Sequence, residues 1–275
     1  MLHKIKLKEK EIEIDLDDKH RYWLDGKQLS GGTKIAQRFA SPSFGIAANW
    51  AGRCAGKRAE EILKKIMSGD TQLNELTLEK IIKSISNSHW AISSEAKEIG
   101  TLVHTALEKL IESRMRDDDE PPEAPFHRGA HAAYQSFLDW EQEAEPTYLG
   151  SEEVIYFRDP KTKNEYTGTL DVVFKLNGVI CVGDFKTSKV FTEEMVAQVA
   201  LYANAYEQCQ GEKVTFIYIF RLPKIEGDKL EIINFRFTDK WRRFCRSMNE
   251  LDHFQREIAQ ELKTQIKEIR KNAKS

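Results

Sequence analysis

The stretch YTGTLDVVFKLNGVICVGDFK, residues 166–186, predicts an antiparallel β-hairpin. Two runs rich in Val, Ile, Phe and Thr flank Asn177-Gly178, a dipeptide that favours a type I′ turn because both of its positions need positive φ. Counting outward from this two-residue turn places Asp171 on one strand directly opposite Asp184 on the other. The hairpin therefore predicts two carboxylates that face each other across neighbouring strands.

These two carboxylates indicate a site for a divalent cation. Like charges directly across an antiparallel pair repel each other, and a cation between them removes the repulsion. Carboxylate oxygens and retained waters are ligands that suit Mg²⁺ or Mn²⁺. Lys186 follows Asp184 by two residues and projects from the same strand face. The alternative is that both acids are solvated at a sheet end, with Lys186 as a neutralising partner.

The elements around the hairpin predict an α/β fold. Residues 4–30 alternate apolar and charged side chains as short strands do, and helical patterns follow up to residue 144. The middle of the chain is strand-like, with a helix before the apolar strand at 213–222. This order favours a central mixed β-sheet flanked by helices, with a helical N-terminal part. The expected helices are 52–67, 76–85, 95–115 (capped by Ser93 or Ser94), 128–144, 193–209 (capped by Thr192) and 240–275, and the other expected strands are 153–158 and 230–237.

Three regions are expected along the chain. Residues 1–92 form an N-terminal strand and helix region packed on the core, residues 93–239 form the core, and residues 240–275 form a basic C-terminal helix. That last stretch carries ten Lys and Arg against five acids, although the whole chain has a net charge of −2. The alternatives for it are a DNA clamp, a surface for a protein partner and a solvated amphipathic helix. The amphipathic helix would pack through Trp241, Phe244, Met248, Leu251 and Phe254.

Composition excludes several classes of protein. A chain of 275 residues that is 40% hydrophobic and 31% charged is neither disordered nor a disulfide-stapled mini-protein. No apolar run approaches the roughly 18–20 residues that span a bilayer, and the N-terminus lacks the apolar region of a signal peptide. We therefore expect a soluble, cytoplasmic protein with no membrane contact. The four cysteines lie too far apart for a paired metal-binding motif, and Cys181 is expected to be a buried thiol.

Two helices carry polar residues at helical spacing. Gly100, His104 and Glu108 follow one another at intervals of four residues and form one stripe. A histidine in such a stripe is either a metal ligand or an ordinary core or surface residue. Gln198 and Tyr202 are also four residues apart, and alone they are equally consistent with a surface without function.

Taken in order, these motifs resemble one known family. The sequence GTLVH (100–104), Glu153, GTLD (168–171), DFKTSK (184–189) and QVALY (198–202) is similar to the RecB-like branch of the PD-(D/E)xK nuclease superfamily. The segment YWLDGKQLSGGTKI (22–35), with Trp50, resembles the corresponding part of phage-encoded and mitochondrial genome-maintenance exonucleases. The paired cysteines of the iron–sulfur members of this family are absent, so no iron–sulfur cluster is expected.

The resemblance implies a restriction-endonuclease-like core and a role for each motif residue. His104, Asp171, Asp184 and the carbonyl of Phe185 would hold the metal, with Glu108 and Glu153 reaching it directly or through water. Glu152 is disfavoured because it points to the strand face opposite Glu153. Lys186 would orient or help deprotonate the attacking water. Gln198 and Tyr202 would position Lys186 or the phosphate backbone. The residues that would contact phosphates are Thr187, Ser188 and Lys189.

The function implied is an Mg²⁺- or Mn²⁺-dependent deoxyribonuclease. An exonuclease acting on DNA ends or single strands is the leading hypothesis, of the phage or prophage type that serves DNA recombination and repair. One alternative is a defence or restriction endonuclease on the same core, which would cut a covalently closed circle. The other is a catalytically silent DNA-binding module, which the presence of Asp171, Asp184 and Lys186 disfavours.

Overall fold

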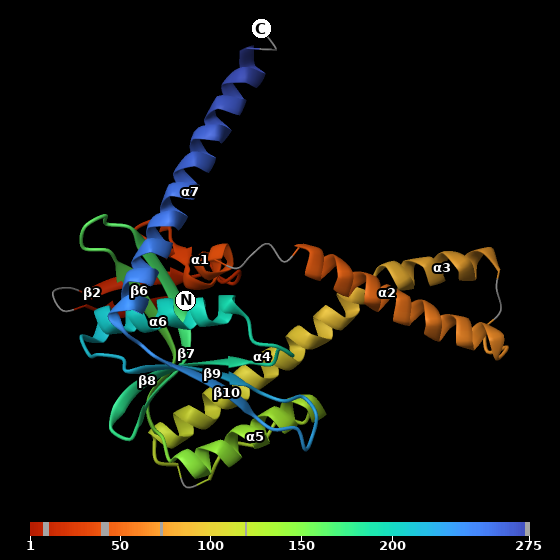
Figure 1. Ribbon diagram of the computed structural model, residues 1–275, viewed down its shortest axis with the longest axis horizontal. Helices are drawn as coiled ribbons and strands as arrows, with labels where there is room; N and C mark the ends of the chain where they lie inside the picture. Colours follow the sequence, from red (N-terminus) through yellow and green to blue (C-terminus); the bar gives the residue numbers. More distant parts are fainter. Residues whose placement is uncertain (8–10, 40–43, 72–73, 119, 273–275) are drawn as a thin grey trace.

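The computed structural model of the chain has a six-stranded mixed β-sheet at its centre (Figure 1). The strand order is β10-β9-β8-β7-β5, with β6 also paired to β7. The β8–β9 and β5–β7 pairs are parallel and the others are antiparallel. The strands are β5 (Ser30–Gly31), β6 (Thr147–Arg158), β7 (Glu165–Leu176), β8 (Val179–Lys186), β9 (Phe216–Arg221) and β10 (Glu231–Arg236). The structure describes residues 1–7, 11–39, 44–71, 74–118 and 120–272.

Helices cover both faces of this sheet. Alternate side chains of β8 point to opposite faces, so Ile180 and Val182 pack with α1, α6 and the start of α7, whereas Cys181 and Phe185 pack with α4 and α5. This arrangement confirms the predicted α/β class and its restriction-endonuclease-like core. The helices are α1 (Gly32–Phe39), α2 (Phe44–Met67), α3 (Glu75–Ser86), α4 (Ser88–Met115), α5 (Arg128–Ala144), α6 (Glu193–Gln210) and α7 (Asp239–Asn272).

The β7–β8 hairpin has the predicted register. Asn177 and Gly178 have φ values of 50° and 79°, as a type I′ turn requires. The ladder that starts at this turn continues to the Val172–Gly183 pair. Asp171 is the next residue on β7, so the acidic residues were correctly located on adjacent strands by counting from the turn.

The N-terminal region is tied into the core sheet. The short strands predicted there form a separate four-stranded antiparallel sheet, while β5 pairs in parallel with β7. The Tyr22 hydroxyl lies 3.0 Å from the Thr169 hydroxyl, and Ser30 donates a 2.7 Å hydrogen bond to the buried Asp252 of α7. The strands of the small sheet are β1 (Leu2–Lys6), β2 (Glu11–Leu16), β3 (Tyr22–Leu24) and β4 (Lys27–Gln28).

Helix α4 begins earlier than predicted. It starts at Ser88, so Ser93 and Ser94 lie inside it and neither is its N-cap. The first turns of α4 contact α2 and α3, and this packing supports helix beyond the point that local capping signals indicate. The expected boundary at residues 92 and 93 therefore falls within one continuous helix. By contrast, Thr192 caps α6 as predicted, by accepting a hydrogen bond from the Met195 amide.

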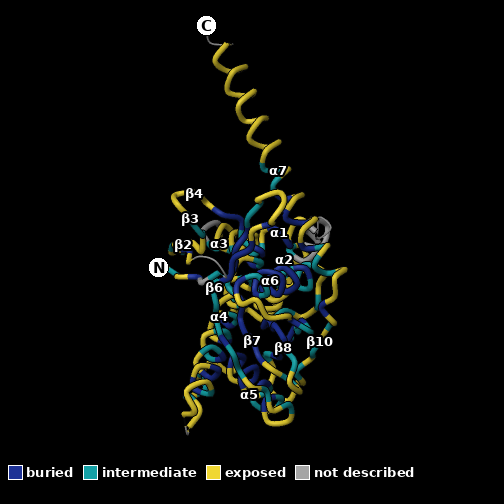
Figure 2. Tube along the Cα trace, turned by 90° about the vertical axis from the view of Figure 1, so that its left-hand side faces the viewer, coloured by how far each residue is buried: buried dark blue, intermediate teal, exposed yellow. Residues whose placement is uncertain are grey.

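Helix α7 leaves the core part-way along its length. Trp241 and Phe244 pack against the core, but Leu251 and Phe254 are 42% and 58% exposed, so the prediction that both pack there was wrong. Every residue from 257 to 272 is exposed, and this part projects away from the sheet (Figures 1 and 2). Residues 273–275, and the side chain of Trp50, lie outside the described part of the chain. Among the described helices, none is long and apolar enough to cross a membrane.

Candidate active site

Two buried carboxylates lie where β7 and β8 run side by side. Asp184 is completely buried and Asp171 is 8% exposed. The Asp171 Oδ2 atom accepts a 2.6 Å hydrogen bond from the Phe185 backbone amide. This bond ties the Asp171 side chain to the neighbouring strand and fixes its orientation.

Burial raises the pKa of both carboxyl groups, that of Asp184 to about 6. The Lys186 ammonium forms an ion pair with Asp184. Burial lowers the pKa of Lys186, but Asp184 and Asp171 outweigh that effect and raise it. Apart from this contact with Lys186, the Asp184 oxygens have no partner among the described residues. A buried carboxylate with unused lone pairs is an expected partner for a cation.

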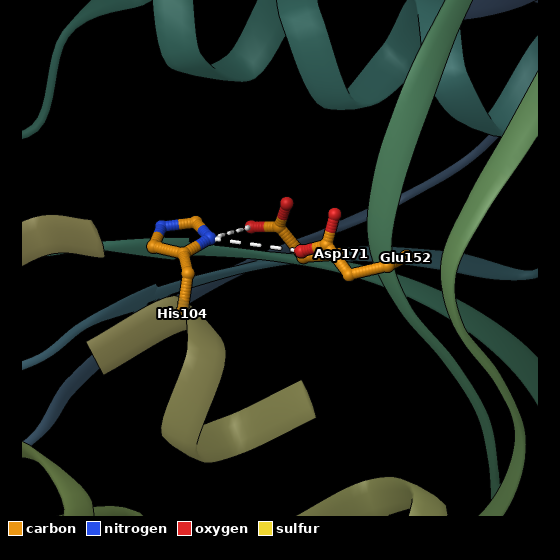
Figure 3. Close-up of side chains that lie close together, drawn as sticks. All are labelled: His104, Glu152 and Asp171. Carbon is orange, nitrogen blue, oxygen red and sulfur yellow. Dashed lines mark ion pairs between the residues drawn. The ribbon is translucent and has the colours of Figure 1, made fainter. Parts of the chain in front are cut away.

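His104 reaches the carboxylates from α4 (Figure 3). Its Nε2 donates to the Phe185 carbonyl at 2.9 Å, which directs Nδ1 towards Asp171 Oδ2 at 3.5 Å. Desolvation lowers the pKa of His104, but the Asp171 and Glu152 carboxylates outweigh it and raise that pKa to about 9. The backbone bond selects the ring nitrogen that is available to a metal, as hydrogen bonds to ligand histidines commonly do.

Glu152, and not Glu153, completes this cluster. The Glu152 Oε1 atom lies 3.9 Å from His104 Nδ1 (Figure 3). In the β6–β7 register Ser151 pairs with Val172 and Glu153 with Leu170, which makes Glu152 the cross-strand neighbour of Asp171.

The backbone explains the orientation of the two glutamates. Glu152 has a φ of 48°, a left-handed conformation that is uncommon outside glycine, and β6 carries a bulge between Tyr148 and Gly150. Glu153 points to the other sheet face, where burial raises its pKa and its charge acts on Tyr206 of α6. The expectation that Glu152 faces away from the site was therefore wrong.

The donor set fits a divalent cation. The ligand atoms of His104, Glu152 and Asp171 all lie within 4.8 Å of one another. Ligands on opposite sides of an ion with bonds of about 2.1–2.3 Å are separated by roughly 4–5 Å. Asp184 lies outside this trio and is held by Lys186, so the sharing of one ion by Asp171 and Asp184 stays a prediction.

Tyr202 and Gln198 form a hydrogen-bonded chain on the α6 side of the sheet. Gln198 donates to the Tyr202 hydroxyl at 3.0 Å, and that hydroxyl lies 3.1 Å from the Thr33 hydroxyl of α1. The Tyr202 ring packs directly over Gly32 and Gly168, where an added Cβ would lie 2.8 and 2.5 Å from ring carbon Cε1. The glycines of SGGT and GTLD therefore make room for this ring, a long-range contact that the two motifs do not reveal separately.

A cleft of about 700 Å³ opens over the cluster. The predicted residues Glu108, Thr187 and Ser188 line it, while Lys189 is exposed outside this lining. Burial, and then the charge of Lys189, lower the pKa of Lys224. Burial and the Glu152 charge raise the pKa of Glu108. Further residues of the lining that the sequence analysis missed are His20, Ser93, Lys97 and Lys224.

The position of Lys97 could have been predicted from helical spacing. Lys97 extends the Gly100, His104 and Glu108 stripe towards the N-terminus of α4 by one turn. There is room for a side chain at Gly100, because an added Cβ would lie 3.5 Å from Thr187 Oγ1, an ordinary van der Waals contact. Its lack of a side chain therefore keeps the helix face flush with the cleft wall.

A pair of substitutions tests the assignment of the two glutamates. We expect Glu152→Gln to weaken Mn²⁺ binding by about 10–100-fold, because it removes a charged oxygen ligand. Glu153→Gln is the matched control and should leave Mn²⁺ affinity unchanged. The measurement is calorimetric titration of each folded variant with Mn²⁺. Equal losses in the two variants, or a loss confined to Glu153→Gln, would contradict the geometry.

The chain is similar to one protein family and to several solved structures. Residues 83–274 match the model of the PD-(D/E)XK nuclease superfamily. An alkaline exonuclease (LHK-Exo) from Laribacter hongkongensis is similar at 14% identity, over 58% of this chain and 82% of that chain, with a TM-score of 0.33. A candidate exonuclease from Eubacterium rectale is similar at 14% identity, over 58% of this chain and 65% of that chain, with a TM-score of 0.36. No curated protein matches.

The family match includes every motif from His104 to Tyr202 and extends over more than half of the chain. Within it lie the paired strands that carry Asp171, Asp184 and Lys186. The chain belongs to the PD-(D/E)XK nuclease superfamily.

Proposed function

We propose that this protein is a DNA nuclease that requires Mg²⁺ or Mn²⁺ and acts as an exonuclease on DNA ends or single strands. The observation that carries the proposal is the convergence of His104, Glu152 and Asp171 beside the buried Asp184–Lys186 pair, at the floor of an open cleft. Such a convergence of acids, one imidazole and one ammonium suits hydrolysis of a phosphodiester bond.

The residues of the cluster have separable roles in this proposal. His104, Glu152 and Asp171 would hold the ion, with Asp184 as a further ligand once Lys186 turns towards substrate. When bound, a divalent ion lowers the pKa of a water ligand and neutralises charge on the phosphate. Lys186 is kept positively charged by its two acidic neighbours, which supports a role in orienting water and stabilising phosphate charge over a role as a base. Glu108, farther up the cleft wall, would act on the ion through water.

The walls of the cleft would carry the DNA backbone. Thr187 and Ser188 follow Lys186 directly, and Lys97 and Lys224 add positive charge on the facing walls. Hydroxyl groups and lysines bind phosphates without reading sequence. Lys189 would contribute at the rim. Gln198 and Tyr202 would position the Lys186 side of the site and not the substrate, because the Tyr202 hydroxyl is already bonded to Thr33 and Gln198.

One digestion experiment tests the proposal. Linear single- and double-stranded DNA, labelled at either end, and a covalently closed circle are incubated with the protein in Mg²⁺, in Mn²⁺ and in a chelator. We expect loss of mononucleotides or short products from linear DNA in Mn²⁺ and Mg²⁺, no reaction in the chelator, and an intact circle. A cut circle would establish an endonuclease instead. DNA binding without cleavage in either metal would establish a silent binding module.

His104 predicts which metal works better. An imidazole nitrogen is a softer ligand than oxygen, so its presence favours Mn²⁺ over Mg²⁺. We expect higher activity in Mn²⁺ for the wild type, and His104→Ala should weaken metal binding and reduce this preference while the fold survives. The ratio of rates in the two metals is the measurement, with circular dichroism as the check on folding. An unchanged ratio in His104→Ala would remove the histidine from the metal site.

A further inference from the structure

The distal half of α7 is a helical segment that projects beyond the core (Figure 2). Residues 257–272 are all exposed, and Figure 2 shows this part extending away from the core. Isolated helices of about 12–15 residues are marginally stable in water, and most helices in proteins are stabilised by packing of an apolar face. A helical segment of this length therefore calls for a partner along one side.

This segment carries an apolar stripe that continues from the edge of the core. The side chains of the stripe are separated by three or four residues, so they stay on one side of a straight helix. All of them are large and between 39% and 67% exposed. The stripe consists of Leu251, Phe254, Ile258, Leu262, Ile266 and Ile269.

The residues next to the stripe are sorted by charge. Successive residues of a helix are separated by about 100°, so the residue before each stripe position lies on one flank and the residue after it on the other. Before the last four stripe positions come Glu257, Glu261, Gln265 and Glu268. After the same positions come Ala259, Lys263, Lys267 and Arg270. One flank is therefore acidic and the other is basic.

We propose that the stripe binds the same stripe of a second copy of this chain, with the two α7 helices parallel and in register. A two-fold axis along such a pair places the acidic flank of each helix beside the basic flank of the other. Glu257 then faces Lys263 of the partner subunit, and Glu261 faces Lys267 of the partner subunit. Charged residues that flank an apolar seam in this way set partner choice and orientation in paired helices.

An antiparallel pair is disfavoured by the same charges. Its two-fold axis is perpendicular to the helices, and it places the acidic flanks together and the basic flanks together. The apolar stripe alone allows either orientation. The separation of acids and bases to opposite flanks is thus the feature that selects the parallel dimer. This dimer is independent of the nuclease activity, because α7 beyond residue 256 lines no part of the cleft.

Oligomeric state in solution tests the proposal. Sedimentation velocity of the full chain between about 1 and 100 µM should show a species of twice the 31.8 kDa monomer mass. The double variant Ile258→Glu/Leu262→Glu should raise the dissociation constant by about 100-fold or more, because buried interface anchors carry most of the binding energy. The control Gln260→Glu/Thr264→Glu adds the same charge on the opposite side of the helix and should stay dimeric.

Cysteine cross-linking tests the orientation. All four native cysteines are buried, so Ile269→Cys provides an accessible thiol near the end of the stripe. In the parallel dimer it should form a disulfide with its own copy, and Lys271→Cys, off the stripe, should not. In an antiparallel dimer centred on residue 260 the two Ile269 positions would be about 27 Å apart.

Further cross-linking and charge-reversal variants test the orientation of the two helices and the pairing of their charges. A mixture of Leu251→Cys and Ile269→Cys chains that cross-links with each other, while neither does so alone, would overturn the parallel orientation. Reversal of one flank, Glu257→Lys/Glu261→Lys, should weaken the dimer about tenfold, and the added reversal Lys263→Glu/Lys267→Glu should restore it. A wild type that stays monomeric at 100 µM, or a dimer unaffected by Ile258→Glu/Leu262→Glu, would overturn the proposal. DNA cleavage by these variants reports separately on the nuclease assignment.

Discussion

Replacement of Lys186 by alanine is expected to lower the rate of DNA cleavage by about 10²–10³ while DNA affinity changes little. The ammonium lies in ion-pair contact with Asp184 and borders the cleft, so it can reach a phosphate bound beside the ion. Loss of one group that stabilises transition-state charge typically costs this much in rate. Loss of one phosphate contact among several costs far less in DNA affinity. It also lowers the slope of log affinity against log salt concentration by about one.

Two measurements separate these effects. Single-turnover cleavage in Mn²⁺ reports chemistry, and DNA binding in Ca²⁺ reports affinity without chemistry. Lys189→Ala is the matched control, because Lys189 is exposed outside the cleft lining. Its loss should alter DNA affinity slightly and the cleavage rate at saturating enzyme hardly at all. Cleavage by Lys186→Ala at the wild-type rate would show that the lysine has no catalytic role. The family assignment would be unaffected by that result.

Gly168→Ala is expected to destabilise the protein by about 1–3 kcal/mol, the usual cost of overpacking a core. The new methyl group would lie 2.5 Å from Tyr202 Cε1 and 3.3 Å from Cζ, so the ring must move. Movement of the ring also breaks the hydrogen bonds from its hydroxyl to Thr33 and Gln198. Urea unfolding measures the stability change, and cleavage activity should fall in parallel.

Gly100→Ala is the control for Gly168→Ala. The same substitution in α4 meets only ordinary contact with Thr187 and gains helix propensity, so stability should stay equal or rise by up to about 1 kcal/mol. A double-mutant cycle checks this explanation. In the Tyr202→Leu background Gly168→Ala should cost less stability, because leucine leaves room for the new methyl group. An equal cost in both backgrounds would mean that the ring is not the obstacle.

The sequence predicted those parts of the site that depend on short spacings. The hairpin register followed from Asn177-Gly178 because a two-residue turn permits one alignment, and the α4 stripe followed from helical periodicity. No such short turn or helical spacing indicates whether Glu152 or Glu153 faces the site. Strands β6 and β7 are joined by residues 159–164, a loop too long to define a register, and the left-handed backbone at Glu152 leaves no signature in residue type.

Contacts between distant segments could not be predicted from the sequence either, because they depend on tertiary packing and not on a local pattern. Lys224 follows β9 and reaches the cleft because of how its loop passes α4, which no local pattern encodes. The exposure of Leu251 and Phe254 likewise depends on where the core ends and not on the helix pattern, which continues unchanged. Periodicity shows which side of a helix is apolar, but the packing partner of that side is a tertiary property.

The link between Ser30 and Asp252 has a consequence for the order of folding. These two residues are 222 positions apart, and the contact from Thr33 to Tyr202 spans 169. Contacts of such long range form late, because the closure of large loops must precede them. During synthesis the N-terminal strands emerge first, yet β5 and α1 cannot settle against the sheet until β7, α6 and finally α7 have been made. The surroundings of Tyr202 are therefore completed only after β7, α6 and α7 have all been made, so the geometry of the site forms late in folding.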